Sequence, residues 1–529
     1  MSFPISEKMD MLLNVLKRMS SVARGRSSGC GVEFLEPRRL MSASVSYSFA
    51  HAIGSTEFDW ARATTTDASG NLYVAGDFMG TVDVDPGPGL TTIKSDTGGD
   101  AFIAKYTQTG SLLWAQSLGG NSDAAGFGWV SDGVYDLTTD AAGNVYATGV
   151  FYDTTDFDAS AVYSPLSANG GADAFVMKLD PAGNLLWAAA SGAGGYDRGT
   201  SVSVDGAGNV TTASVALGDS TDTLTVQRYA SDGTLVWTRQ LQGSFSDPRL
   251  TTRADGHLFL TGSFSRDFTD FDPGEGVSTL STAGASSAAF LTRWDTDGNH
   301  VWSHSYGTRR TASSWANDIA LDSGGNVLIV GGFSGMVDFD PSPETVRNRS
   351  SVNASVGAFF NKVNGDGRFI FNRAVDGPGF DEARAVTMVS NDNFISAGVL
   401  EGTFDFNSAS GTLMVTSRGG IDAFVAKFSK FGFPIWAATA GGEGYDYAND
   451  VTSYRGAVTL VGGFESTADF DPEPDAVQSR TSNGNYDVFV QRLVQLNPTA
   501  ASPGGPKPIG ASLFSTRTQI LDEEMTVLK

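Results

Sequence analysis

Residues 67–78 read DASGNLYVAGDF, residues 140–151 read DAAGNVYATGVF, and residues 322–333 read DSGGNVLIVGGF. A second block follows these copies: residues 100–114 read DAFIAKYTQTGSLLW, residues 173–187 read DAFVMKLDPAGNLLW, and residues 422–436 read DAFVAKFSKFGFPIW. Weaker copies of the first block start near Asp205, Arg253, Val389 and Ser453. Self-similarity of this kind is the signature of a repeat architecture. The chain is therefore built from copies of one unit.

The number of repeats follows from the aromatic residue that closes the second block. These residues are Trp114, Trp187, Trp237, Trp302, Phe371 and Trp436, separated by 73, 50, 65, 69 and 65 residues. A seventh repeat runs from about Tyr445 to Arg492 and lacks its closing aromatic strand. Residues 49–55, FAHAIGS, supply a match to residues 114–120, WAQSLGG. Six complete repeats and one split between the two ends of the repeat region make seven.

The pattern within a repeat predicts four short β-strands. In the first repeat we expect them at Ala63–Thr66, Leu72–Phe78, Ala101–Tyr106 and Leu112–Ser117, because short apolar runs there are bounded by Gly and Asp. Four-stranded units around an axis form a propeller, whose closure removes exposed sheet edges. The sequence therefore predicts an all-β fold: a seven-bladed propeller of antiparallel blades. Its last blade would be closed by an N-terminal strand, with Val45–Ile53 paired to Phe489–Leu493.

Composition narrows the class of protein. The chain has 529 residues, 64 of them Gly, and a net charge of −24. Such acidity disfavours nucleic-acid partners. The single cysteine, Cys30, excludes an intrachain disulfide and a Cys-based zinc site. No apolar run reaches the roughly 18 residues of a membrane-spanning helix. The expected organisation is a targeting or disordered segment at 1–43, the propeller at 44–495 and a linker-like tail at 496–529.

The repeat blocks resemble the SBBP family, the bacterial seven-bladed β-propeller repeat, over about residues 44–495. We expect a long variable loop between the second and third strands of a repeat. The third repeat departs from the family pattern, with Thr225 in place of Phe and without that long loop. The resemblance implies a propeller in exported or surface proteins, and it implies no defined catalytic activity. Residues 35–43, LEPRRLMSA, are similar to the LEPR-type N-terminal motif of some large bacterial surface proteins, with Met41 where Leu is usual. That similarity implies export to the outside or surface of a bacterium.

A recurrent Asp-x-Asp motif is the one candidate metal site. Its pairs are Asp83/Asp85, Asp156/Asp158, Asp270/Asp272, Asp338/Asp340 and Asp469/Asp471, with Asp405/Asn407 in the sixth repeat. Alternate strand residues face one side, and Ca²⁺ prefers clustered oxygens. A following Pro in four pairs also fits turn formation. Both interpretations, weak Ca²⁺ binding and turn formation, stay open from sequence.

Two further sets of recurrent residues have competing interpretations. The repeat Trp and Phe side chains fit packing between blades, or stacking platforms for a sugar or quinone. A basic residue closes every third strand, and these residues fit pairing with nearby carboxylates or an anion-binding ring. They are Lys105, Lys178, Arg228, Arg293, Lys362, Lys427 and Arg492.

Enzyme signatures are absent from the sequence: there is no His-Glu-x-x-His, nucleophile elbow or phosphate loop. We therefore expect a non-enzymatic, monomeric surface propeller that acts as an interaction scaffold for an unknown protein or glycan partner, without a resident cofactor. A propeller that binds Ca²⁺ or a glycan is the alternative. A quinoprotein-like enzyme ranks behind both.

Overall fold

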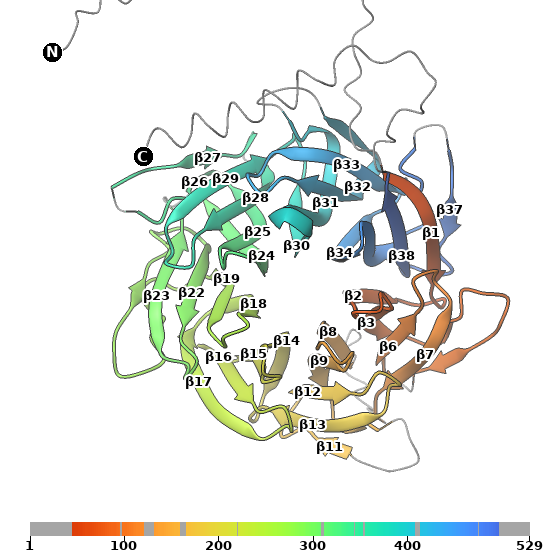
Figure 1. Ribbon diagram of the computed structural model, residues 1–529, viewed down its shortest axis with the longest axis horizontal. Helices are drawn as coiled ribbons and strands as arrows, with labels where there is room; N and C mark the ends of the chain where they lie inside the picture. The colour runs from red at the N-terminus through yellow and green to blue at the C-terminus, as the bar shows by residue number, and fades with distance from the viewer. Residues whose placement is uncertain are drawn as a thin grey trace, which may run out of the picture. The chain divides into compact units, whose positions relative to one another are not determined.

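A computed structural model describes residues 45–95, 98–120, 132–158, 165–218, 221–307, 312–342, 344–352, 355–407, 413–473 and 476–496. Within these residues seven antiparallel sheets, each with four blade strands, surround a central axis (Figure 1). Helical structure among them is limited to a 3₁₀ turn at Ser390–Asp392 and a 3₁₀ residue at Val352. The predicted all-β seven-bladed propeller is confirmed.

The blades follow one another along the chain, and each runs from the axis outward. Blade 1 consists of β2 (Trp60–Thr66), β3 (Leu72–Phe78), β6 (Asp100–Tyr106) and β7 (Leu112–Leu118), and blade 2 consists of β8 (Gly133–Thr139), β9 (Val145–Phe151), β12 (Asp173–Leu179) and β13 (Leu185–Ser191). Blade 3 consists of β14 (Tyr196–Val204), β15 (Val210–Leu217), β16 (Asp222–Tyr229) and β17 (Leu235–Gly243), and blade 4 consists of β18 (Phe245–Thr252), β19 (Leu258–Phe264), β22 (Ala288–Trp294) and β23 (His300–Tyr306). Blade 5 consists of β24 (Ser313–Leu321), β25 (Val327–Ser334), β28 (Val356–Val363) and β29 (Phe369–Val375). Blade 6 consists of β30 (Glu382–Met388), β31 (Phe394–Asp405), β32 (Met414–Phe428) and β33 (Pro434–Gly442). Blade 7 consists of β34 (Asp446–Tyr454), β35 (Ala457–Phe464), β38 (Asp487–Gln495) and β1 (Val45–Ile53).

The repeated Asp-x-x-Gly-Asn sequence forms the turn between the first two strands of a blade. In blade 1 the Asp67 Oδ1 accepts hydrogen bonds from the backbone N–H groups of Ser69 and Asn71, both at 2.9 Å. Gly70 has a φ of 81°, in the left-handed region that glycine adopts without a steric penalty. The recurrent Asp and Gly therefore stabilise a tight hairpin rather than a binding loop.

The hydrophobic core lies between neighbouring blades. The second and third strands of blade 1, β3 and β6, are buried along their whole length. One core cluster joins Tyr73 and Ile103 of blade 1 to Val145, Phe151 and Phe175 of blade 2. Each blade thus stabilises the next one around the ring.

The last blade is closed by the N-terminal strand. β1 pairs antiparallel with β38, with Phe49 opposite Arg492 and Ile53 opposite Val488. The strand order β1-β38-β35-β34 puts β1 at the outer edge of blade 7. This confirms the split repeat that the sequence predicts.

The long segment between the second and third strands is a small β-hairpin in five blades, where the sequence analysis expects only a loop. The hairpins are β4 (Thr81–Asp83) with β5 (Thr92–Lys94), β10 (Thr154–Asp156) with β11 (Pro165–Ser167), β20 (Thr269–Asp270) with β21 (Thr279–Leu280), β26 (Met336–Asp338) with β27 (Asn348–Ser350), and β36 (Thr467–Asp469) with β37 (Ser479–Thr481). In blade 6 the same hairpin is continuous with β31 and β32.

The first strand of blade 1 begins at Trp60, three residues before the predicted start at Ala63. A register shift between Ala61 and Ala63 interrupts the alternation that the prediction used. The same irregularity positions side chains of the candidate site described below. No helix among the described residues has the length and apolar character needed to cross a membrane.

Candidate functional site

All seven inner strands carry a β-bulge at the same level. In each strand the pairing with the second strand skips one or two residues. A bulge leaves a residue out of the ladder and redirects its side chain. The skipped residues are Arg62, Tyr135, Thr200, Asp247 with Pro248, Asn317, Arg384 and Asn449.

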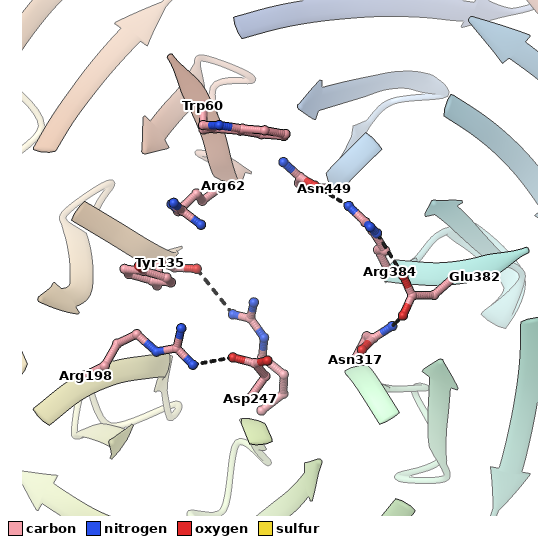
Figure 2. Close-up of a pocket in the computed structure, with 10 residues that line it drawn as sticks. Trp60, Arg62, Tyr135, Arg198, Asp247, Asn317, Glu382, Arg384 and Asn449 are labelled. Atoms are coloured by element: carbon pink, nitrogen blue, oxygen red, sulfur yellow. Dashed lines mark hydrogen bonds and ion pairs between the residues drawn. The ribbon is translucent and has the colours of Figure 1, made fainter. Parts of the chain in front are cut away.

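Six of these eight skipped residues line the mouth of the central channel: Arg62, Tyr135, Asp247, Asn317, Arg384 and Asn449. A cavity of about 550 Å³ opens there, and Figure 2 shows its lining side chains around an open centre. The cavity is lined by Trp60, Arg62, Tyr135, Arg198, Asp247, Arg249, Asn317, Glu382, Arg384 and Asn449. Four guanidinium groups from four different blades thus converge in a protein whose net charge is −24. We call this set of ten residues the channel mouth.

Two arginines flank Tyr135. The guanidinium carbon of Arg62 lies 4.6 Å from the centre of the Tyr135 ring, and that of Arg198 lies 5.1 Å from it. Arg62 is paired with Asp77, and Arg198 Nη2 lies 2.5 Å from Asp247 Oδ1. Cation–π contacts and ion pairs of this kind hold both guanidinium groups in defined orientations.

The charges of these two arginines are reinforced by their partners. Burial opposes the charge of Arg62, but the Asp77 carboxylate raises its pKa above the usual arginine value. Burial likewise opposes the charge of Arg198, and the Asp247 carboxylate raises its pKa. Asp247 has a φ of 43°, a backbone conformation that costs free energy for a residue with a side chain. The channel mouth therefore contains backbone strain at Asp247, one of its two acidic residues.

The opposite side of the channel mouth is a hydrogen-bonded network (Figure 2). Arg384 Nε donates to Glu382 Oε2 at 3.0 Å, and Arg384 Nη1 donates to Asn449 Oδ1 at 3.0 Å. Asn317 Nδ2 donates to Glu382 Oε1 at 3.0 Å, and Trp315 Nε1 donates to the same oxygen. The Glu382 carboxylate is therefore held by three donors.

Arg249 differs from the other three arginines of the channel mouth. Its Nη1 donates to the backbone carbonyls of Thr200 at 2.7 Å and Tyr135 at 3.3 Å. Among the described residues no carboxylate lies within ion-pair distance of Arg249, although the other three arginines each have one. Its charge acts only at longer range, where it opposes the rise in the pKa of the buried Asp136 and Asp318 carboxyl groups. The guanidinium is anchored to the channel wall while its charge has no direct partner.

Below the channel mouth, three carboxylates connect neighbouring blades. Asp136, Asp318 and Asp450 each accept a backbone N–H of the next blade, from Val202 at 2.8 Å, Val386 at 2.6 Å and Thr64 at 2.7 Å respectively. Burial raises the pKa of all three carboxyl groups, that of Asp318 to about 7. These carboxylates are structural connections between strands.

The Asp-x-Asp pairs lie in the hairpins at the edge of the propeller and not at the channel mouth. In every pair the first Asp accepts the backbone N–H of the second residue through its Oδ1. The distances are 3.1 Å for Asp83 with Asp85, Asp156 with Asp158, Asp270 with Asp272 and Asp338 with Asp340, 3.0 Å for Asp469 with Asp471, and 2.9 Å for Asp405 with Asn407. These contacts are those of turn-forming carboxylates.

The second Asp of a pair supports the next turn in the same way. Its Oδ1 accepts the backbone N–H two residues further along the chain. The distances are 2.8 Å for Asp85 with Gly87 and for Asp272 with Gly274, and 3.0 Å for Asp340 with Ser342 and for Asp471 with Glu473. Asp158 stands at the end of the described part of its hairpin. Turn formation therefore accounts for the recurrence of both carboxylates.

Among the described residues, the candidate Ca²⁺ ligands are not gathered into a larger cluster of acidic side chains. The described residues contain no group of three or more His, Cys, Asp or Glu side chains placed to hold a metal ion. A pair supplies two carboxylates, and Ca²⁺ takes six to eight oxygens. Ca²⁺ binding by a pair together with backbone carbonyls and water therefore stays a prediction at all ten positions, namely Asp83, Asp85, Asp156, Asp158, Asp270, Asp272, Asp338, Asp340, Asp469 and Asp471.

Six of the seven recurrent basic residues are buried, and Arg293 is partly exposed. Carboxylate pairing, one of the two interpretations, holds for Lys105 with Asp67 at 3.5 Å and Lys362 with Asp322 at 2.6 Å. Arg228 pairs with Asp205. Lys178 Nζ instead donates to the Ser231 carbonyl of the next blade at 3.1 Å. The three carboxylate partners lie in the same blade as their cations, whereas the contact of Lys178 reaches the next blade. The arginines of the channel mouth are a different set.

The channel mouth was not identified from the sequence. A signal exists, because Ala-Arg or Ala-Asn lies in four of the inner strands, at the position of the bulge: Ala61-Arg62, Ala316-Asn317, Ala383-Arg384 and Ala448-Asn449. The spacing alone does not show that these residues are bulged, so the sequence does not place them at the axis. The four histidines lie outside the channel mouth.

No protein-family model matches the chain. Among curated proteins, an uncharacterized WD repeat-containing protein, L264, from Acanthamoeba polyphaga mimivirus is 21% identical over 438 residues, covering 68% of this chain and 30% of the relative. The chain thus spans less than a third of that relative. The similarity to SBBP repeats stays a prediction, and residues 35–43, with the LEPR-type motif, lie outside the described residues.

Three solved structures are similar to the propeller. A crystal structure of the polysaccharide lyase Uly1 has 9% sequence identity, covers 82% of this chain and 90% of its own, and has a TM-score of 0.40. Sqt1 from Chaetomium thermophilum has 9% identity, covers 86% and 100%, and has a TM-score of 0.28. A point variant of an ACO/RPE65 chimera, in a monoclinic crystal form, has 10% identity, covers 78% and 89%, and has a TM-score of 0.32. No statement about activity follows from these similarities.

Proposed function

We propose that this chain is a non-enzymatic binding propeller that engages its ligand or partner at the channel mouth. The observation that carries the proposal is the convergence of four guanidinium groups on one cavity of about 550 Å³. That volume is within the range of small-molecule sites. Arg, Trp and Tyr are also the residues that dominate binding energy at protein interfaces. The distant WD-repeat relative supports an interaction scaffold.

Binding rather than turnover fits the state of the acidic residues. A general acid or base must be able to exchange a proton with the substrate. Asp247 is held in an ion pair with Arg198, and Glu382 accepts hydrogen bonds from Trp315, Asn317 and Arg384. Both carboxylates are thereby committed to positioning their neighbours. A ligand incubated with the protein should be recovered unchanged, as mass spectrometry would check.

The proposal includes no resident cofactor. Ca²⁺ at the Asp-x-Asp pairs is left outside it, because the first carboxylate of a pair such as Asp338 already accepts two backbone N–H groups, those of Asp340 and Arg347. The protein is proposed to act as a monomer, since each blade has its neighbours within the same chain.

Export to the outside or surface of a bacterium is the second part of the proposal. It rests on the similarity of residues 35–43 to the LEPR-type motif. Cell fractionation with sequencing of the mature N-terminus tests it. A protein confined to the cytoplasm, with Met1 intact, would contradict this part and leave the binding proposal standing.

Glycan and peptide arrays test the binding proposal. The informative variant is Arg198→Gln/Arg384→Gln, whose side chains are 28% and 27% exposed. The control is Arg253→Gln/Arg455→Gln, which removes the same charge from the turns at the other end of the inner strands. Array signals that disappear in the first variant and persist in the control support the proposal. Signals that survive in both variants, or no signal on either array, overturn it.

A further inference from the structure

The channel mouth contains more kinds of group than an anion site needs. It combines guanidinium groups with acidic and amide side chains and with aromatic rings, all lining one cavity. A site for an inorganic anion or for an acidic peptide needs positive charge and hydrogen-bond donors only. The additional acceptors and aromatic rings therefore indicate which further chemical groups the ligand contains.

The guanidinium groups define a place for one carboxylate. Arg249 uses its Nη1 for two backbone carbonyls, and among the described residues it has no ion-pair partner. A guanidinium presents five N–H donors in a planar fork that matches a carboxylate. A ligand carboxylate would supply the partner that Arg249 lacks, whereas Arg62, Arg198 and Arg384 already have theirs.

The acceptors of the channel mouth match hydroxyl groups. Asp247, whose side chain is 60% exposed, presents carboxylate oxygen to the cavity. Glu382, Asn317 and Asn449 add further acceptors and donors. A hydroxyl group donates one hydrogen bond and accepts two, so a ligand with several hydroxyls can use such a mixture. A polyacidic peptide would instead meet like charge at Asp247 and Glu382, which disfavours it.

The aromatic residues offer a surface for the apolar face of a ring. The indole of Trp60 stacks on Tyr486, with ring centres 4.9 Å apart and planes 25° apart. Figure 2 places Trp60 at the rim of the cavity, close to Arg62 and Asn449. An amphipathic aromatic ring backed by another ring is a rigid contact surface with little entropy to lose. The C–H face of a sugar ring fits such a surface.

From these observations we infer that the channel mouth binds an acidic saccharide, a sugar that carries a carboxylate. The carboxylate lies against Arg249, the hydroxyl groups contact Asp247, Glu382 and Asn317, and the ring packs at the Trp60 rim. This inference rests on the proposed function, because it names the ligand class of the same site. The mixture of acids, amides and aromatic rings selects it over an acidic peptide.

Titration calorimetry with three probes tests the inference. The probes are D-glucuronate, D-glucose and an acetylated, amidated tetraglutamate peptide. We expect saturable binding of glucuronate. Glucose should bind at least about tenfold more weakly, because it lacks the carboxylate that would form charge-assisted hydrogen bonds with Arg249. Tetraglutamate should not saturate. No saturation by glucuronate, equal binding of glucose, or preferred binding of tetraglutamate would each overturn the inference.

Variants assign the binding to the channel mouth. Arg198→Gln/Arg384→Gln should weaken glucuronate binding about tenfold, and the control Arg253→Gln/Arg455→Gln should leave it unchanged. Arg249→Lys keeps the charge and removes the planar fork, so it should also weaken glucuronate binding while glucose binding stays the same. If Arg249→Lys lowers the melting temperature too far for calorimetry, the double variant decides. Equal binding by the double variant and the control would overturn the inference.

Failure of the inference and failure of the proposed function give different results. Array binding of a neutral glycan or a peptide that depends on Arg198 and Arg384 keeps the proposed function and overturns the acidic saccharide. Absence of any array signal that depends on those arginines overturns both.

Discussion

The outer strand of blade 1 and the outer strand of blade 6 meet the next blade in different ways. At the joint between blades 1 and 2, Trp114 Nε1 and Lys105 Nζ donate to the Pro181 carbonyl at 3.2 and 2.8 Å. Gln116 Nε2 donates to the Gly183 carbonyl at 2.5 Å. Both carbonyls belong to the turn between β12 and β13. One turn of blade 2 thus receives three donors from blade 1.

Other joints repeat this arrangement. Trp187 and Lys178 donate to the Ser231 carbonyl at 3.3 and 3.1 Å, while Trp302 and Arg293 donate to the Gly365 carbonyl at 3.2 and 2.9 Å. Each acceptor lies in the turn between the third and fourth strands of the following blade. The recurrent aromatic and basic residues of the sequence are therefore a device for joining blades.

The joint between blades 6 and 7 lacks this turn, because the outer two strands of blade 7 are β38 and β1, from the two ends of the propeller. Trp436 is 2% exposed, and its indole N–H has no hydrogen-bond partner among the described residues. Ala438 stands where blade 1 has Gln116. Lys427 Nζ donates to Gln495 Oε1 of β38 at 2.6 Å. Of the three kinds of donor that the turn accepts from blade 1, the Gln side chain is missing in blade 6 and the Lys ammonium is directed to Gln495 instead. The indole N–H of Trp436 has no partner among the described residues.

A different contact replaces the turn. The hairpin of blade 7 pairs with blade 6, with Gly441 of β33 opposite Asp469 of β36 and Gly442 opposite Ala468. Arg418 of blade 6 forms an ion pair with Asp469 at 2.9 Å. Closing the propeller with a split blade thus removes one set of contacts between blades 6 and 7. The sheet of blade 6 is extended by the hairpin of blade 7 in its place.

The largest effect on stability is expected from removal of the closing strand, β1. Deleting residues 1–54 removes β1 and exposes the whole edge of β38, so the melting temperature should fall by more than about 10 °C and the protein should aggregate. Deleting residues 1–43 keeps β1 and serves as the control, with little expected change. Differential scanning calorimetry measures both. Equal melting temperatures for the two truncations would show that β1 does not close the ring.

The basic residues of the two joints give the next test. Lys105→Met leaves the Asp67 carboxylate, 6% exposed, without its cation, so the free energy of unfolding should fall by about 3 kcal/mol. Lys427→Met removes a partner only from the neutral Gln495, so the loss should be about 1 kcal/mol. Urea unfolding measures the difference. Lys362→Met, which removes the partner of Asp322, should behave like Lys105→Met. Equal losses at Lys105 and Lys427 would contradict the comparison.

A buried carboxyl group is common to both joints and makes stability depend on pH. Burial raises the pKa of Asp132, at the joint between blades 1 and 2, to about 8, and that of Asp446, at the joint between blades 6 and 7, to about 7. In the unfolded chain the pKa is about 3.9. The stabilising contribution is complete below that value and is lost as pH rises through 7 to 8. The melting temperature should therefore fall between about pH 5.5 and about pH 8.5.

The control for this pH dependence is a carboxylate on the surface. Asp446→Asn should make the fall in melting temperature shallower, because it removes one of the groups that ionises. Asp366→Asn, at a side chain 74% exposed, should leave the slope unchanged. A melting temperature that rises with pH over this range would show that the buried carboxyl groups do not titrate as described.

Most of the ring was predictable from the sequence. The repeats give the number of blades, and the incomplete seventh repeat gives the closure by Val45–Ile53, which pairs with β38. The second strand of blade 1 has the predicted bounds Leu72–Phe78, because a continuous apolar run between Asn and Gly-containing segments marks a fully buried strand.

The channel mouth was not predictable to the same degree. The bulges at Arg62 and Arg384 break the alternation, and no local residue preference marks a bulge whose purpose is to aim a side chain at the axis. The hairpins at the Asp-x-Asp pairs were expected as loops for a related reason. Their pairing of two or three residues is too short for a periodic pattern.

A smaller difference in stability is expected between Asp-x-Asp residues that lie at the joint between blades 6 and 7 and those that lie elsewhere. Asp338→Ala removes the acceptor of two backbone N–H groups and should lower the free energy of unfolding by about 1 kcal/mol. Asp469→Ala removes the same kind of acceptor and also the ion pair with Arg418 across the joint between blades 6 and 7. Its loss should exceed that of Asp338→Ala by about 0.5 kcal/mol. In an Arg418→Gln background the two losses should become equal, and a persisting difference would exclude the ion pair as its cause.

The smallest expected effect is that of Ca²⁺ on the same residues. A cation that binds only the folded state raises stability by RT ln(1 + [L]/Kd), so even weak sites repeated over several hairpins would add to a measurable shift. The Asp338 and Asp469 carboxylates are already engaged by backbone N–H groups, and a cation would have to replace those hydrogen bonds. We therefore expect about 5 mM CaCl₂ to change the melting temperature by less than about 1 °C. A saturable increase that is lost in Asp338→Ala/Asp340→Ala would establish Ca²⁺ sites in the hairpins. An increase lost only in Asp469→Ala/Asp471→Ala would instead place the cation at the joint where the turn is missing.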